Sequence, residues 1–163
     1  MKNVMENQYR KKPNRLAGFD YSTPGYYFIT ICTKNHLCLL GKIVSENELI
    51  PAVMELNTTG QIVQAVAEEI PYHYPGAKLD KYTIMPNHVH MILVLNDSSP
   101  TGPSIHRIIQ QYKRTVSIRI GEPIWQPRFY DHIIRSEREY QEIWKYIDNN
   151  PAKWALDKYY HEM

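Results

Sequence analysis

The sequence predicts an α+β fold in which helices pack on one antiparallel β-sheet. Several short segments are rich in aromatic and β-branched residues, which favour strands. Other segments repeat apolar residues at the spacing of amphipathic helices. Strands and helices do not alternate in the regular βαβ order of a parallel sheet, and this favours the α+β class. We expect a single domain over residues 1–163.

The bulk composition is that of an ordinary globular protein. The chain has 163 residues, 43% hydrophobic and 22% charged, enough for one hydrophobic core and short for two domains. No window approaches the roughly 20 apolar residues of a membrane-spanning helix, so no membrane partner is expected. The first residues lack the apolar stretch of a signal peptide, which predicts a cytoplasmic protein. Cys32 and Cys38 lack CxxC spacing and indicate buried or idle thiols rather than a disulfide or a zinc site.

The first part of the chain predicts an arm, a strand and a hairpin. Residues 1–24 form a basic N-terminal arm followed by a turn rich in Ser, Pro and Gly. The aromatic and β-branched run 26–33 predicts a strand. Segments 39–44 and 48–50 predict a hairpin that turns at 45–47.

The middle of the chain predicts a helix followed by two paired strands. Pro51 opens the helical stretch, and the apolar spacing continues up to Pro71, which ends it. Segments 79–85 and 88–95 predict a second hairpin, and the later strand is apolar enough to be buried. Residues 96–103, rich in Ser and Pro, form a connecting loop.

The last part of the chain predicts helices on either side of a short strand. Residues 104–119 form a helix that its first serine can cap, and residues 130–135 form a strand. Ser136 and Glu139 have the spacing of a capping box. They open the C-terminal helical segment 136–163.

Two histidines, His88 and His90, flank one apolar residue at the start of the most apolar strand. Because side chains alternate along a strand, both imidazoles face the same side of the sheet, whereas Val89 faces the other. They are therefore close enough to hold one metal ion between them. The alternative interpretation is two polar residues on the open face of a half-buried strand, and a two-ligand motif alone is weak evidence for a metal site.

One tyrosine lies on the apolar stripe of the basic helix 104–119. Most tyrosines on such a stripe belong to the core. The alternative is that the stripe lies against the sheet face that carries His88 and His90. Tyr112 would then approach a bound cation, which assists a weak phenol nucleophile, while Lys113 and Arg114 would hold phosphates. The stripe consists of Ile105, Ile108, Ile109, Tyr112 and Val116.

The distribution of charge is more informative than the net charge of +2. The first twenty residues contain five Lys or Arg and two acidic residues, and 104–119 contains four basic residues and no acid. A basic arm and a basic helix on a near-neutral body are typical of a nucleic-acid-binding surface. A solvated surface without a partner is the alternative.

Two motifs, Pro-Asn-His-x-His at 86–90 and Asp-His-x-Ile-Arg at 131–135, are specific in this order and spacing. With other segments they resemble the HUH single-strand DNA transposases of bacterial insertion sequences, most closely the REP-associated tyrosine transposases. The resemblance covers nearly the whole chain. Its further segments are 27–30, 109–113, 125–130, 139–140, 146–147, 149–151 and Trp154.

The resemblance implies a ferredoxin-like or RRM-like antiparallel sheet and a transesterification on single-stranded DNA that contains a hairpin. A tyrosine attacks a phosphodiester, giving a 5′-phosphotyrosine and a free 3′-hydroxyl, and a later 3′-hydroxyl attack reverses the step. By position, Tyr112 is the nucleophile, His88 and His90 are metal ligands, and Mg²⁺ or Mn²⁺ is the cofactor. The resemblance implies a bacterial, nucleoid-associated protein and is compatible with both a homodimer and a monomer.

The sequence departs from the family at the third metal ligand. Insertion-sequence relatives commonly supply a Gln one turn after the nucleophile, where this chain has Val116. His132, Gln111 or water are the candidates to replace it, and His132 has a structural role as an equal alternative. Two imidazole ligands suit Mn²⁺ better than Mg²⁺.

The predicted DNA contacts are basic residues for phosphates and aromatic residues for stacking on unpaired bases. Core packing is the alternative for the aromatic residues, and solvated surface for the basic arm. These predicted contacts are Arg10, Lys11, Lys12, Arg15, Arg107, Lys113, Arg114, Trp125, Arg128, Tyr130 and Arg135, with Phe129 as a further stacking candidate.

Two other functions compete with strand transfer. The first is a non-catalytic protein that binds structured DNA or RNA, and the second is a metal-dependent nuclease that uses water. A phenylalanine at position 112 or the loss of a histidine would favour the binding protein, so the intact Tyr112, His88 and His90 favour an enzyme. A nuclease that uses water would leave no DNA attached to the protein.

Overall fold

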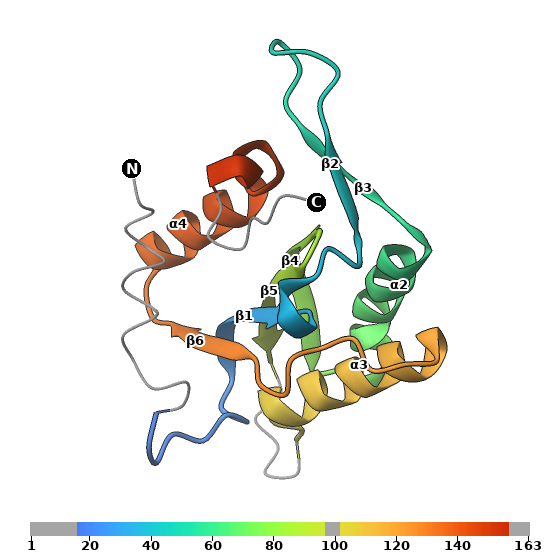
Figure 1. The fold of residues 1–163 in the computed structure, drawn as a ribbon. Coiled ribbons are helices and arrows are strands. Elements are labelled where there is room, and N and C mark those ends of the chain that lie inside the picture. The colour runs from blue at the N-terminus through green and yellow to red at the C-terminus, as the bar shows by residue number, and fades with distance from the viewer. Residues whose placement is uncertain (1–15, 97–101, 157–163) are drawn as a thin grey trace.

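The computed structural model describes residues 16–96 and 102–156, with a four-stranded antiparallel sheet at the centre (Figure 1). The strand order is β4-β5-β1-β6. β5 is buried along its whole length between β4 and β1, which explains its apolar sequence. The strands are β1 (Gly25–Cys32), β4 (Ala77–Met85), β5 (His88–Leu95) and β6 (Tyr130–Ile134).

Helices cover both faces of this sheet. α2 (Thr58–His73) and α3 (Ile105–Ile120) pack on one face, and α4 (Glu137–Asp148) packs on the other (Figure 1). The chain order β1-α2-β4-β5-α3-β6 with this strand order is the ferredoxin-like arrangement. The predicted α+β fold is confirmed. Among the described helices, none has the length and apolar content needed to cross a membrane.

The two faces of β5 belong to different clusters of buried side chains. Val89, Met91 and Leu93 face α2 and α3 and form part of the larger core. Ile92 lies on the other face, in the smaller cluster with Ile143 of α4 and its neighbours. The alternation of side chains along the strand places the two histidines on this α4 face.

The hairpin β2–β3 (Gly41–Val44 and Val53–Leu56) forms a separate two-stranded sheet. The sequence prediction of its second strand at 48–50, with a helix opening at Pro51, is wrong. The connecting loop is longer than predicted, and residues 53–56 alternate in burial and pair with β2. A short alternating run next to a helix is easily assigned to that helix from sequence.

Helix α2 begins later and ends later than predicted. The side chain of Asn57 caps it by accepting a hydrogen bond from the Gly60 N–H at 2.9 Å. The helix continues through Pro71, and the Tyr74 N–H still donates to the Ile70 carbonyl at 2.9 Å. A proline in the last turn removes only one donor and so need not end the helix.

Gly60 allows α2 to approach the chain at Leu40, and we expect Gly60→Ala to lower the melting temperature. A Cβ at this position would lie 2.0 Å from the Leu40 carbonyl oxygen. Such overpacking typically costs about 1–3 kcal/mol, against the gain of roughly 1 kcal/mol from alanine in a helix. Thermal unfolding followed by circular dichroism measures the effect. The neighbouring exposed substitution Gln61→Ala is the control, and an unchanged melting temperature for Gly60→Ala would contradict this close packing.

Polar contacts along one side of α4 attach it to the edge strand β4. The Tyr140 hydroxyl donates to Asp80 at 2.6 Å, and this hydrogen bond raises the pKa of Tyr140 to about 12. The Lys81 ammonium lies 2.7 Å from Asp148 and 3.9 Å from the centre of the Trp144 ring. These contacts, with the buried isoleucines of the helix, hold α4 over the histidine face.

The predicted capping box of α4 is present in altered form. The Ser136 hydroxyl accepts a hydrogen bond from the Glu139 N–H at 3.1 Å, as predicted. Glu139 accepts from the Arg135 N–H at 2.9 Å instead of from Ser136, and its other oxygen contacts His132. The glutamate therefore joins the helix start to β6.

Candidate functional site

His88 and His90 lie next to each other on the α4 face of β5, as the strand periodicity predicts. They are 0% and 2% exposed, and their ring centres are 4.5 Å apart. The His90 Nδ1 atom lies 2.8 Å from the Thr30 hydroxyl, and the His88 Nδ1 atom lies 2.8 Å from the Asn87 Oδ1 atom. Because both Nδ1 atoms contact neighbouring protein groups, Nε2 is the nitrogen that each ring could present to a cation.

A tyrosine of α4 completes this group of side chains. The Tyr146 hydroxyl lies 3.5 Å from the His90 Nε2 atom, and the two ring centres are 5.3 Å apart. Tyr146 is half-buried between the buried helix residues Ile143 and Ile147. The amphipathic pattern of α4 thus places a phenol beside the histidine pair.

The predicted contact between Tyr112 and the histidine pair is wrong. The stripe of α3 packs into the core on the opposite face of the sheet, so β5 itself separates Tyr112 from His88 and His90. Tyr112 is 2% exposed and donates a hydrogen bond to the Val63 carbonyl at 3.1 Å. Burial raises its pKa well above the usual value for tyrosine, which disfavours the phenolate. Tyr112 is a core residue.

The two side-chain candidates for a third metal ligand, Gln111 and His132, do not join the pair. Gln111 lies exposed on α3, on the wrong side of the sheet. His132 is on β6, paired in register with Phe28, and its Nε2 atom contacts Glu139. Within residues 16–96 and 102–156, no group of three His, Cys, Asp or Glu side chains is placed to hold a metal ion. Among the His, Cys, Asp and Glu side chains of these described residues, the donors close to Tyr146 are the imidazoles of His88 and His90.

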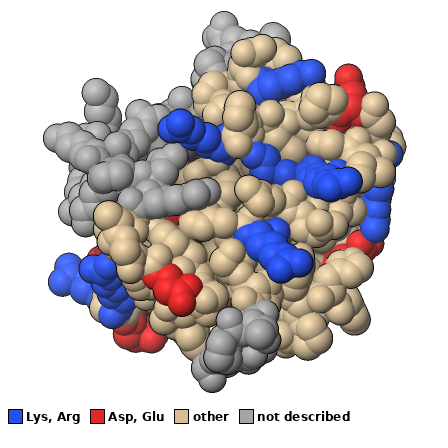
Figure 2. All heavy atoms as spheres, turned by 90° about the horizontal axis from the view of Figure 1, so that it is seen from below, with Lys and Arg blue, Asp and Glu red and all other residues tan. Residues whose placement is uncertain are grey.

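The predicted phosphate contacts lie on different sides of the molecule. Arg107 and Arg114 are exposed on α3, away from the histidines. Figure 2 views the molecule from below, where α3 lies in Figure 1, and shows Lys and Arg side chains across the middle of this face. Arg128 and Arg135 are exposed just before and just after β6, the edge strand.

Lys113 and the predicted stacking residues are less accessible than expected. The Lys113 ammonium donates to the Gln126 carbonyl at 2.6 Å, and burial lowers its pKa. Trp125 is 9% exposed and packs against Tyr112, which corrects its predicted role in stacking on bases. Tyr130 is half-buried against Phe28. The predicted contacts Arg10, Lys11, Lys12 and Arg15 lie outside the described residues.

Two aromatic residues near the histidines have positions that the sequence did not predict. Tyr146 and Trp154 belong to the segments that carry the family resemblance, but no role in the site is predicted for them from the sequence. Trp154 stacks on His88 with ring centres 6.2 Å apart and planes at 27°. The signal that could have identified Tyr146 is its position between the apolar residues of α4, but Tyr112 has the same kind of position on α3.

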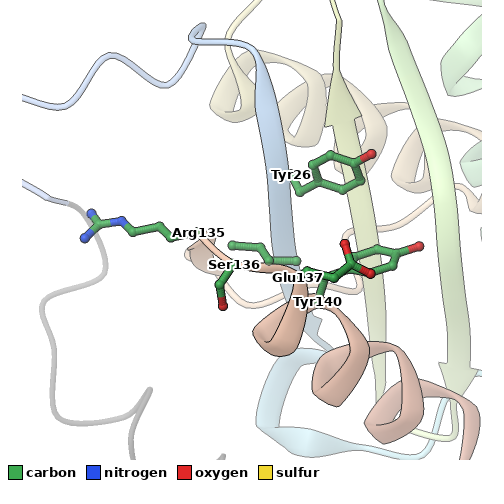
Figure 3. A pocket seen from close by; sticks show the side chains of 6 residues that line it. Tyr26, Arg135, Ser136, Glu137 and Tyr140 are labelled. Carbon is green, nitrogen blue, oxygen red and sulfur yellow. The ribbon is translucent and has the colours of Figure 1, made fainter.

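A hollow of about 320 Å³ lies on the same sheet face, toward the start of β1 (Figure 3). Tyr26, 43% exposed, meets Tyr140 edge to face with ring centres 5.4 Å apart. In Figure 3 the Arg135 side chain points away from these two rings. Tyr26 is more accessible for stacking on a base than the predicted Trp125. The lining residues are Tyr26, Ile134, Arg135, Ser136, Glu137 and Tyr140.

No protein-family model matches this chain, but known proteins resemble it, among them two relatives in sequence and one solved structure. An uncharacterized protein of Haemophilus influenzae is 32% identical over 175 residues, covering 93% of this chain and 94% of the relative. The REP-associated tyrosine transposase of Escherichia coli K12 is 31% identical over 77 residues. That match covers 47% of this chain and only 45% of the transposase. A solved structure of a REP-associated tyrosine transposase bound to a REP hairpin has the same fold. Its TM-score is 0.64 at 22% identity, over 88% of this chain and 76% of the other.

Proposed function

This chain belongs to the same family as the Haemophilus influenzae protein and has the fold of a REP-associated tyrosine transposase. From this premise we propose that it is a metal-dependent transesterase that cleaves and rejoins hairpin-containing single-stranded DNA. The observation that supports the proposal most directly is the 3.5 Å distance between the Tyr146 hydroxyl and the His90 Nε2 atom. The candidate nucleophile Tyr146, on α4, then lies beside the two candidate metal ligands, His88 and His90, on the sheet face that α4 covers.

In this proposal Tyr146 replaces Tyr112 as the nucleophile. The Tyr146 oxygen attacks the phosphorus of a phosphodiester, and the bond from phosphorus to the 3′ oxygen breaks. The phenol loses its proton, the leaving 3′ oxygen gains one, and the 5′ phosphate stays on the tyrosine. Attack by a 3′-hydroxyl reverses these changes, so no hydrolysis is needed.

The residues present fit a divalent cation held by two imidazoles. His88 and His90 would contribute their Nε2 atoms, since each Nδ1 atom contacts Asn87 or Thr30. Oxygen ligands from DNA or water would complete the coordination. Imidazole nitrogens suit Mn²⁺ better than Mg²⁺. The cation would supply stabilisation of the negative charge that develops on the phosphate oxygens.

The test of this function follows both ends of a DNA strand. Single strands with a hairpin and randomised flanks, labelled at either end, are incubated with the protein and Mn²⁺ or Mg²⁺ and run on denaturing gels. The 3′-end label should migrate with the protein and the 5′-end label should be released, because the 5′ phosphate of the downstream fragment is held. Peptide mapping of the adduct should identify Tyr146. Cleavage without an adduct would mean a nuclease that uses water, and binding without cleavage would mean a binding protein.

We expect the single strand to pass along the edge strand β6, where Arg128 and Arg135 are exposed on either side. Arg128→Gln with Arg135→Gln should weaken binding of single-stranded DNA. The slope of log affinity against log salt should become shallower by about 0.7 for each phosphate that the protein no longer neutralises. Fluorescence anisotropy at several salt concentrations measures both effects.

The matched control for this prediction removes two arginines from α3, the helix on the sheet face opposite the histidines. Arg107→Gln with Arg114→Gln changes the net charge by the same amount but should leave single-strand binding nearly unchanged. If the control pair weakened binding more than the β6 pair, the α3 face in Figure 2 would be the surface that binds the single strand.

A further inference from the structure

Asn87, in the turn between β4 and β5, lies fully buried beside His88. Its Nδ2 atom donates a hydrogen bond to the His36 carbonyl at 3.1 Å. Its Oδ1 atom lies 2.8 Å from the Nδ1 atom of His88. The amide therefore joins a backbone carbonyl on one side to an imidazole on the other.

These contacts determine which way round the amide lies and where the imidazole proton lies. A carbonyl oxygen only accepts hydrogen bonds, so the Asn87 atom that faces His36 must be the NH₂ group. The atom that faces His88 must then be the amide oxygen, which also only accepts. His88 must donate to it from Nδ1, and a neutral imidazole with its proton on Nδ1 has its lone pair on Nε2.

The carbonyl of His36 is held in place by unusual backbone geometry. Asn35 and His36 have φ angles of 54° and 53°, which residues other than glycine adopt rarely. Thr33 ties the same turn to Asn87, since its N–H and its hydroxyl both lie 3.0 Å from the Asn87 carbonyl oxygen. Residues other than glycine adopt such left-handed conformations at an energetic cost, and they cluster at functional sites. Here the turn presents its carbonyl to the buried Asn87 amide.

We infer that Asn87 is a positioning residue that holds His88 with its proton on Nδ1 and so directs the Nε2 lone pair toward the cation. The left-handed turn at Asn35 and His36 places the carbonyl that accepts a hydrogen bond from the Asn87 NH₂ group. The inference rests on the proposed function for the identity of His88 as a ligand. Mutation of a residue that hydrogen-bonds to a metal-ligating histidine typically lowers metal affinity by about 10–100-fold.

Two substitutions separate positioning from a structural role. Asn87→Leu removes both hydrogen bonds. Asn87→Asp loses the donor to the His36 carbonyl but keeps an oxygen that accepts from His88. If Asn87 only stabilised the fold, both variants would lose Mn²⁺ affinity together. Positioning predicts that Asn87→Leu loses about 10–100-fold in Mn²⁺ affinity and that Asn87→Asp stays close to the wild type.

The first measurement uses the protein without metal or DNA. Long-range ¹H–¹⁵N correlation spectra distinguish a protonated ring nitrogen from one with a lone pair, and His88→Gln assigns the His88 signals. We expect the Nδ1-protonated form in the wild type and in Asn87→Asp, and a mixture of both forms in Asn87→Leu. The second measurement follows the Mn²⁺ affinity of the same proteins by the electron paramagnetic resonance signal of the aqueous ion.

The outcomes distinguish this inference from the proposed function. A His88 proton on Nε2 in the wild type, or equal loss of Mn²⁺ affinity in both variants, would overturn the positioning role. If Asn87→Leu does not fold, the wild-type spectrum and the Mn²⁺ affinity of Asn87→Asp still decide. If the spectra and affinities agree with expectation but no DNA adduct forms, the positioning role holds and the proposed transesterification fails.

Discussion

Tyr146→Phe is expected to abolish the covalent protein–DNA adduct while DNA binding persists. The phenol oxygen is the proposed attacking atom, and it lies 3.5 Å from the Nε2 atom of His90. Loss of a nucleophile typically costs about three orders of magnitude or more in rate. The ring of phenylalanine can keep the packing of the half-buried tyrosine on α4. Denaturing gels with 3′-labelled hairpin DNA measure the adduct, and anisotropy measures binding.

Tyr112→Phe is the matched control, because it removes one hydroxyl from a tyrosine on the other face of the sheet. It loses the hydrogen bond to the Val63 carbonyl, which contributes about 1 kcal/mol to stability, and it should still form the adduct. The melting temperature should therefore fall while the activity remains. An adduct that disappears in Tyr112→Phe and persists in Tyr146→Phe would reject the site on the α4 face.

Replacing either histidine of the pair, His88→Gln or His90→Gln, is expected to reduce adduct formation by on the order of 100-fold or more. The imidazole Nε2 atoms are the proposed metal ligands, and a glutamine amide is a weaker ligand for Mn²⁺. Titration with Mn²⁺ should show a parallel loss of affinity. Glutamine can still form hydrogen bonds in the buried position, so the fold should persist, and circular dichroism checks this.

His132→Gln is the control for the histidine pair. His132 lies on the same sheet face, but its Nε2 atom contacts Glu139, so the substitution should leave the Mn²⁺ affinity unchanged. An equal loss of Mn²⁺ affinity in His132→Gln would make His132 the third ligand, one of the candidates from the sequence. Full activity of a variant that carries both His88→Gln and His90→Gln would contradict a metal site at this pair.

The local sequence was sufficient to predict most helices and strands, and to predict the histidine pair of the site but not its tyrosine. Alternation along β5 predicts that His88 and His90 share a face, and the structure shows their rings 4.5 Å apart. The prediction follows from backbone geometry alone, because side chains two residues apart in a strand point the same way. The hairpin β4–β5 and helix α3 follow from periodicity in the same manner.

Boundaries that depend on neighbouring chain segments were not predictable. β3 is a strand because it pairs with β2, and its four residues by themselves read as the start of α2. Gly60 is a poor helix former by itself, but in the structure it permits a close approach of α2 to the Leu40 carbonyl. In both cases the deciding contact comes from a segment distant in the sequence.

The choice between two tyrosines belongs to the tertiary structure. Tyr112 and Tyr146 each lie on the apolar side of an amphipathic helix, so periodicity alone treats them alike. α3 connects the parallel strands β5 and β6, and such crossovers are strongly biased to one hand, which favours one face of the sheet for α3 together with α2. α4 follows the last strand of the sheet and covers the face that remains. The sequence by itself determined that two histidines share a face. Only the packing of the helices decided which tyrosine lies beside these histidines. An apolar stripe on a helix shows which side chains are buried, but not which part of the protein they are buried against.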